Sequence, residues 1–134
     1  INSVISNLAD VSNFNTSNLT NGNYSWRVRA IDNAGNVGNW SLPWTFTIDT
    51  NAPASPNLVS IASNSLTTNI APNLVWNRVT DANGIAGYDI EINSVISNLA
   101  DVSNFNKSNL TNGNYSWRVR TIDNAGNVGN WSLP

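Results

Sequence analysis

The sequence predicts an all-β protein in which short antiparallel strands form a β-sandwich. Three observations predict it: an internal repeat, segments in which apolar and polar residues alternate, and Asn-Gly turns between those segments. No segment has apolar residues at the i, i+3, i+4, i+7 spacing of a helix. Residues 1–13 come closest, and their Asn and Ser content disfavours a helix. About seven short strands per repeat is typical of a sandwich.

The internal repeat has a period of 91 residues. Residues 1–43 match residues 92–134 except that Thr16 is replaced by Lys107 and Ala30 by Thr121. Self-similarity at a fixed period is typical of a tandem array, so we interpret the 134 residues as a window on a longer repeat protein. We expect residues 1–50 to hold the late strands of one repeat, without its early ones. Residues 51–134 should hold the early and middle strands of the next repeat, without its final one.

The strands are assigned from alternating side chains, because successive residues of a strand point to opposite faces. Alternation marks residues 24–30, 44–49, 74–77 and 88–93. Turn sequences separate these segments, with Asn-Gly pairs at 21–22, 83–84 and 112–113 and an Asn-Ala-Gly-Asn segment at 33–36. The alternation predicts that four tryptophans point into the core: Trp26, Trp44, Trp76 and Trp117.

The composition excludes several classes of function. The chain lacks His, Cys and Met, so it has no imidazole base, thiolate nucleophile or soft metal ligand. Its net charge is −2, which argues against nucleic acid as a partner. No apolar run approaches the roughly 20 residues of a membrane span, so we expect no membrane insertion in this segment.

Two carboxylates, Asp89 and Glu91, share a strand face and superficially resemble the catalytic pair of a glycosidase. Such a pair needs a cleft and one raised pKa. Arg118 and Arg120 likewise share one face of a strand, so guanidinium groups are available to pair with these carboxylates. The sequence therefore predicts surface ion pairs and no enzyme activity.

The segment at residues 107–121, KSNLTNGNYSWRVRT, resembles the sixth strand of fibronectin type III modules. The resemblance implies a fibronectin-III/Ig-like β-sandwich with a tyrosine corner, in which the Tyr hydroxyl bonds back to the backbone near the turn. Residues 73–76, 87–92 and 44–49 look like three further strands, and residues 50–56 are similar to the joints of bacterial Ig-like surface repeats. The structural residues that we assign from the resemblance and from the alternation are Leu19, Tyr24, Trp26, Trp76, Tyr88, Leu110, Tyr115 and Trp117.

The Trp-Ser pairs at residues 40–41 and 131–132 are similar to an element of cytokine-receptor modules in which indoles stack on Arg side chains. We therefore expect two cation–π ladders. One would join Arg27 and Arg29 to Trp40. The other would join Arg118 and Arg120 to Trp131. The alternative is that Trp40 packs under its own loop without an Arg contact.

Calcium is the one metal for which the sequence offers candidate ligands, and no other cofactor is expected. The candidates are Asp32 in a loop, and Asp49 with Asn51 at the joint between repeats. Calcium sites usually combine several carboxylates, and each candidate site has one. A polar linker, or an Asp that caps its own turn, explains the same residues.

Glycan attachment is a further expectation from the sequence. Asn-x-Ser/Thr sequons occur at Asn15, Asn18, Asn39, Asn106, Asn109 and Asn130, and also beside the corner tyrosines at Asn23 and Asn114. The alternative is an Asn-rich composition without modification, because 27 Asn residues would give roughly five sequons by chance.

Two functions agree with these features. The first is a non-enzymatic structural module of an extracellular or cell-surface array, forming the shaft of an adhesin or a fibre. The alternative is a carbohydrate-binding or adhesive module of a secreted or surface protein. As partners we expect neighbouring repeats or identical chains, which would complete the sandwich by placing an equivalent of residues 44–49 beside residues 114–121. Residues 50–55 reach at most about 20 Å, which disfavours closure by the chain's own residues 44–49.

Overall fold

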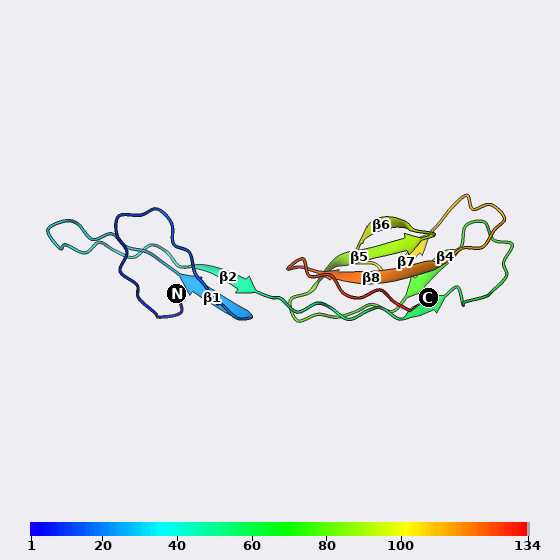
Figure 1. Cartoon of the computed structure of the whole chain (residues 1–134), viewed down its shortest axis with the longest axis horizontal. Coiled ribbons are helices and arrows are strands. Elements are labelled where there is room, and N and C mark those ends of the chain that lie inside the picture. Colours follow the sequence, from blue (N-terminus) through cyan, green and yellow to red (C-terminus); the bar gives the residue numbers. More distant parts are fainter. Residues whose placement is uncertain (134) are drawn as a thin grey trace. The chain divides into compact units, whose positions relative to one another are not determined.

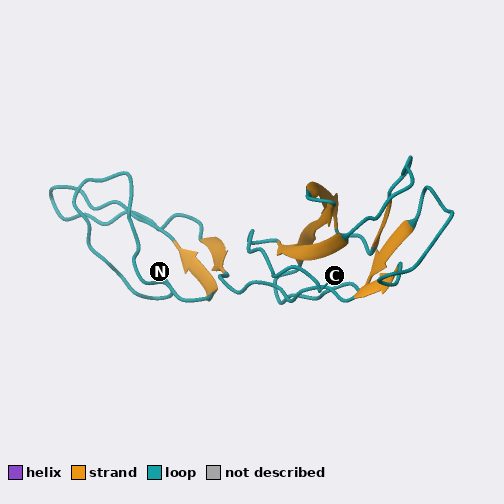
Figure 2. Ribbon diagram, turned by 45° about the vertical axis from the view of Figure 1, so that its right-hand side comes forward, coloured by secondary structure: helices purple, strands orange, loops and turns teal. Residues whose placement is uncertain are grey.

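The structure is a computed structural model that describes residues 1–133, and all its regular elements are β-strands (Figure 2). The chain divides into two compact units. Unit 1 is Ile1–Thr50, and unit 2 begins at Asn51. Within residues 1–133, no helix has the length and apolarity needed to cross a membrane.

Unit 2 contains two three-stranded antiparallel sheets (Figure 1). The first sheet has the order β3-β4-β7, and the second has the order β6-β5-β8. The strands are β3 (Leu58–Ser60), β4 (Asn73–Trp76), β5 (Ile85–Ile92), β6 (Val95–Ala100), β7 (Asn104–Asn106) and β8 (Trp117–Asp123). This is the fibronectin-III/Ig-like β-sandwich that the sequence predicts.

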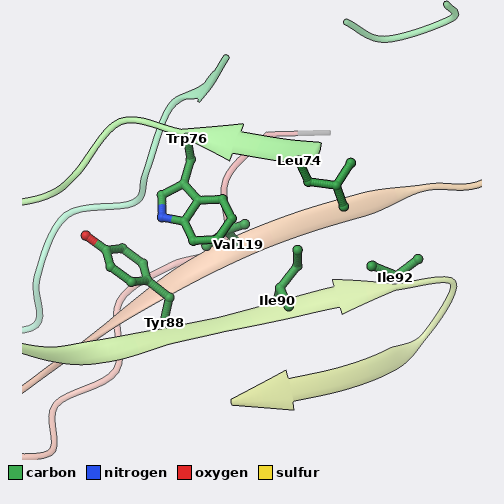
Figure 3. Packing of buried hydrophobic residues seen from close by; sticks show 6 residues of the cluster. All are labelled: Leu74, Trp76, Tyr88, Ile90, Ile92 and Val119. Atoms are coloured by element: carbon green, nitrogen blue, oxygen red, sulfur yellow. The ribbon is translucent and has the colours of Figure 1, made fainter. Parts of the chain in front are cut away.

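The core of unit 2 lies between the two sheets (Figure 3). Trp76 of β4 faces Tyr88 of β5, with ring centroids 5.5 Å apart, and Val119 of β8 lies beside them. Leu74, Ile90 and Ile92 continue the same buried cluster. The core residues of β4 and β5 are thus alternate residues of each strand, which is the two-residue period that identified these strands.

Unit 1 contains one antiparallel pair, β1 (Gly22–Trp26) and β2 (Trp44–Ile48). Its register places Gly22 opposite Ile48 and Trp26 opposite Trp44. Aromatic rings pair across the two strands. Tyr24 stacks on Phe46 at 5.4 Å, and Trp26 meets Trp44 edge to face at 6.2 Å.

The same 43-residue sequence therefore forms different strands in the two units. Residues 117–123 form β8 beside β5, whereas the equivalent positions 26–32 of unit 1 contribute only Trp26 to a strand. Residues 22–26 form β1 beside β2, whereas the equivalent residues 113–117 contribute only Trp117 to a strand of unit 2. Each stretch becomes a strand where its partner is present, because a strand is stabilised by its neighbours.

The expectation that Trp26 and Trp44 are core residues is wrong for unit 1. Trp26 is 41% exposed and Trp44 is 71% exposed. The physical reason is that unit 1 has no counterpart of β4 and β5 for these indoles to pack against. In unit 2 such strands are present, and Trp117, the equivalent of Trp26, is half-buried against the core.

Candidate functional site

The side chains on the outer face of the β6-β5-β8 sheet form an Arg–Trp ladder in unit 2. The guanidinium carbons of Arg118 and Arg120 both lie 4.6 Å from the ring centroid of Trp131. These distances are within the range of attraction between a cation and an aromatic face. Two guanidinium cations from β8 thus lie against the indole ring of Trp131.

Two ion pairs extend the ladder across the sheet. Arg118 bonds Glu91 at 2.8 Å, and Arg120 bonds Asp89 at 2.8 Å. Both pairs are directly opposite in the β5–β8 register, so the expectation that opposite charges face each other across the sheet is confirmed. Each carboxylate therefore accepts a hydrogen bond from a guanidinium of β8.

Asp89 is more buried than a surface ion pair would be. It is only 3% exposed, because Arg120 covers it from one side and the Asn98 side-chain amide bonds it from the other. Asp89 is therefore paired across the sheet as expected, but the expectation that this pair is exposed at the surface is wrong for its carboxylate. The contact with Asn98 could not be predicted, because β6 lacks a strict alternation of apolar and polar residues.

Ser132 positions Trp131 for the ladder. Its backbone N–H donates to the Val119 carbonyl at 2.7 Å, and its Oγ accepts the Val119 N–H at 3.1 Å. These two bonds fasten the loop to β8 and place the preceding Trp beside the arginines of that strand. The Trp-Ser order of the motif follows from this arrangement.

Unit 1 contains the same ladder without the ion pairs. Arg27 and Arg29 lie 4.7 and 4.4 Å from the Trp40 ring centroid. Ser41 makes the two equivalent bonds to Val28, at 2.8 and 3.1 Å. Since unit 1 has no strand like β5 to supply carboxylates, the Arg–Trp contact depends only on the local sequence.

Both tyrosines of the predicted corners bond back to the turn before them. Tyr24 donates to the Thr20 carbonyl at 2.8 Å, and Tyr115 donates to the Thr111 carbonyl at 3.1 Å. Leu19 and Leu110, which precede these threonines, are half-buried. Tyr88 lies in the core, where its hydroxyl accepts the Val79 N–H at 3.0 Å. The sequence did not indicate that bond.

Asp32 caps its own turn, which was the alternative to a calcium ligand. Its carboxylate accepts the Asn36 side-chain amide at 2.7 Å and the N–H groups of Asn36 and Ala34 at 2.8 and 2.9 Å. The side-chain and backbone bonds from Asn36 lower the pKa of Asp32. Asp49, directly after β2, and Asn51 both have interaction partners. Calcium binding stays a prediction.

Asp123 is the repeat equivalent of Asp32 and is buried in unit 2. Burial raises the pKa of Asp123, but the hydrogen bonds from Asn127, Ala125 and Gly126 outweigh this effect and lower the pKa below its ordinary value. The carboxylate thereby organises the turn that returns the chain along β8, where Ile122 bridges Val128.

The candidate glycosylation sites are all exposed, and modification stays a prediction. Exposure is shared by Asn15, Asn18, Asn39, Asn106, Asn109 and Asn130. Asn18 and Asn109 have a φ of 59°, a left-handed conformation that Asn tolerates better than most residues.

Sequence reasoning missed a hairpin that connects β5 to β6. Asn93 and Ser94 form its turn with φ values of 46° and 67°. A polar pair between Ile92 and Val95 was the available signal, because two-residue hairpin turns need left-handed residues. Asn93 also bonds the Ser116 N–H at 2.8 Å and donates to the Asn114 carbonyl at 3.3 Å, which fixes the segment before β8.

No family model matches the sequence. It is 36% identical to endoglucanase B of Cellulomonas fimi over 123 residues, covering 83% of this chain and 12% of that protein. It is 35% identical to exoglucanase B of the same species over 115 residues, covering 78% of this chain and 10% of that protein. It is 32% identical to chitinase A1 of Niallia circulans over 120 residues, covering 84% of this chain and 17% of that protein.

The chain thus spans between a tenth and a sixth of the length of these relatives. The shortest match covers 78% of 134 residues, about 105, which is more than either unit contains. The similarity to each relative therefore runs across the joint at residues 50–51. Unit 2 has a fibronectin-III/Ig-like β-sandwich fold, and the matches to short parts of these relatives support a fibronectin III-like module.

Proposed function

We propose that the chain is a non-catalytic structural module of an extracellular repeat array, which spaces other parts of a longer protein. One observation carries the proposal: the aromatic and charged side chains of unit 2 are used within the module. Trp76 and Tyr88 form the core, Trp131 is covered by two arginines, and Asp89 is bonded to Arg120.

The comparisons support a role beside other domains. Two of the relatives are named as glucanases and the third as a chitinase, and the chain matches only a small portion of each protein. A module that is similar to a short part of different enzymes suits a spacer better than an active site. Extracellular location, and the more specific role of a shaft in an adhesin or a fibre, belong to the same proposal.

The neutral surface also suits this role. Only 10% of the residues are charged, and Asn, Ser and Thr supply much of the polarity. Equal units placed in series contact mainly their neighbours, so length can be changed by adding units without altering any one of them.

A carbohydrate-binding module is the second candidate, favoured by the names of the relatives. Such a module stacks sugar rings on exposed aromatic faces. In unit 2 the most exposed aromatic residue is Tyr115, at 40%, and it is committed to its corner hydrogen bond. The structural role therefore explains the aromatic residues of unit 2 more completely.

Retention on insoluble polysaccharide separates the two candidates. The chain is mixed with cellulose and with chitin, and the bound fraction is measured beside a Tyr115→Ala variant. The structural role predicts no retention of either protein. Retention of the parent chain that is lost in the variant would establish carbohydrate binding and refute a purely structural module.

A further inference from the structure

We propose that the hydroxyl of Thr121 clamps the segment through which the chain enters unit 2, and that this clamp sets the stiffness of the joint in front of the unit. We refer to residues 51–56 as the joint segment. The inference rests on the proposed function, because the stiffness of a joint matters only in an array of units. It assigns one position of the repeat at which that stiffness can change while the fold of the unit stays the same.

The joint segment lies against β8 and the loop that follows it. The Thr121 hydroxyl donates to the Ala54 carbonyl at 3.0 Å. The carbonyl oxygen of Pro53 lies so close to Gly129 that a Cβ at that position would clash with it. Pro53 and Pro56 are buried, whereas the two residues between them are exposed. The bond from Thr121 is thus one of several contacts that seat the joint segment on unit 2.

The burial of Thr121 makes its hydroxyl an effective clamp. Its side chain is fully buried, and its backbone carbonyl already accepts the Gly129 N–H at 2.9 Å. A small displacement of Ala54 would leave the hydroxyl without this acceptor while the neighbouring residues still exclude water. A buried hydroxyl that loses its partner costs free energy, because no water replaces the bond. This cost opposes movement of the joint segment away from β8.

A second clamp holds the chain where it leaves unit 1. Thr50 donates to the Asn21 side-chain oxygen through its N–H at 3.1 Å and through its hydroxyl at 2.8 Å. Only residues 51–53 lie between this clamp and Ala54. Proline fixes φ at residue 53 and restricts the preceding Ala52 to extended conformations. Few backbone torsions of the joint can therefore change as long as both clamps are closed.

The two copies of the repeat differ at the clamping position. Ala30 occupies in unit 1 the position that Thr121 occupies in unit 2, and this is one of only two differences between residues 1–43 and residues 92–134. Alanine has no hydroxyl, so a unit that carries it cannot form the bond. The glycine that admits the joint segment is present in both copies, as Gly38 and Gly129. Units with Thr should therefore have stiffer joints than units with Ala.

The distance between two spin labels, one in each unit, tests the clamp. The chain contains no cysteine, so labels can be attached at Thr45→Cys in β2 and Ala100→Cys in β6, both of which are exposed strand positions. Pulsed dipolar EPR measures the width of the distance distribution. We expect Thr121→Ala to broaden this distribution and Thr121→Ser, which keeps a hydroxyl, to retain the parent width. Equal widths for the parent and Thr121→Ala chains, or equal broadening by Ala and Ser, would overturn the proposal.

The equivalent glycines provide a matched pair of variants that does not depend on the hydroxyl. Gly129→Ala should broaden the distribution, because the added Cβ would displace the Pro53 carbonyl. Gly38→Ala places the same Cβ in ordinary contact with the Ala30 carbonyl oxygen, at 3.5 Å, and should leave the width unchanged. Equal widths for the two variants would refute the seating of the joint segment on unit 2.

Thermal unfolding of the same proteins separates a loosened joint from a damaged unit. Alanine is the residue of unit 1 at this position, so we expect Thr121→Ala to unfold in a transition like that of the parent chain. Broadening that appears only together with loss of this transition would assign the effect to unfolding and reject the clamp. The spacer role has its own test, because retention of the parent chain on cellulose or chitin would refute that role, whereas an unchanged distance distribution would refute the clamp alone.

Discussion

Val28 and Val119 occupy the same position of the repeat and donate the same hydrogen bond, yet only one of them is buried. The Val28 N–H donates to the Ser41 hydroxyl, and the Val119 N–H donates to the Ser132 hydroxyl, both at 3.1 Å. Val28 is 55% exposed and Val119 is fully buried. The difference arises from β4 and β5, which cover Val119 with Trp76, Tyr88 and Ile90 and have no counterpart in unit 1.

This relationship predicts unequal effects of one substitution at two equivalent sites. Val119→Ala should lower the free energy of unfolding of unit 2 by about 2 kcal/mol, because it removes two buried methyl groups and leaves a cavity. Val28→Ala is the matched control and should change stability by less than about 0.5 kcal/mol. Urea denaturation followed by tryptophan fluorescence measures both. Similar losses at the two positions would contradict the assigned core.

The two ion pairs of the ladder should differ in their contribution to stability. Arg120→Gln should cost about 2–3 kcal/mol, because it leaves the almost fully buried Asp89 without its cation. Arg118→Gln leaves Glu91 without its cation, but Glu91 is more exposed than Asp89. The free energy of unfolding should therefore fall by less than about 1 kcal/mol. Both variants lose one contact with Trp131, so their difference isolates the buried carboxylate. Thermal unfolding at neutral pH provides the comparison, and equal losses would refute it.

The tyrosine corner predicts the effect of removing one hydroxyl. Tyr115→Phe should cost about 1 kcal/mol, because the hydroxyl both donates to the Thr111 carbonyl and accepts the Thr111 N–H. Tyr115 is partly exposed, so water replaces some of these bonds in the variant. Tyr24→Phe is the matched substitution in unit 1. A Tyr115→Phe chain with unchanged denaturation would show that the corner contributes no net stability.

The lowered pKa of Asp123 predicts a dependence of stability on pH. Its carboxylate is more acidic in the folded chain than in the unfolded chain, so its contribution is complete above the unfolded pKa, about 4. The contribution is lost as the pH falls through the folded value. Asp123→Asn should therefore lose less stability between pH 5 and about pH 2 than the parent chain does. Melting temperatures across this range test the prediction, and equally steep curves for both proteins would contradict it.

The fold and the ladder could be predicted because they depend on local patterns. Alternation in residues 88–93 located β5, and the spacing of Arg118, Arg120 and Trp131 predicted contacts that the structure contains. Unit 1 shows why this worked. The Arg27–Trp40 contact forms there even though most of a sandwich is absent.

Burial could not be predicted in the same way, because it depends on partners distant in the sequence. Trp26 and Trp117 have the same flanking residues, but only Trp117 packs against a core. The burial of Asp89 also depends on a partner from another strand. Its position in β5 indicated a solvent-facing ion pair, whereas Asn98 of β6 covers it. The hairpin at Asn93 that brings Asn98 there was also missed.

Amide hydrogen exchange at Val28 and Val119 tests most directly that partner strands, rather than local sequence, determine the structure of each copy. The two N–H groups have equivalent hydrogen-bond acceptors and identical neighbours along the chain except at residue 30 and its equivalent 121. Exchange at Val119 should be slower than at Val28 by more than about tenfold, because it requires opening of the unit 2 core. Equal exchange at the two sites would contradict the account.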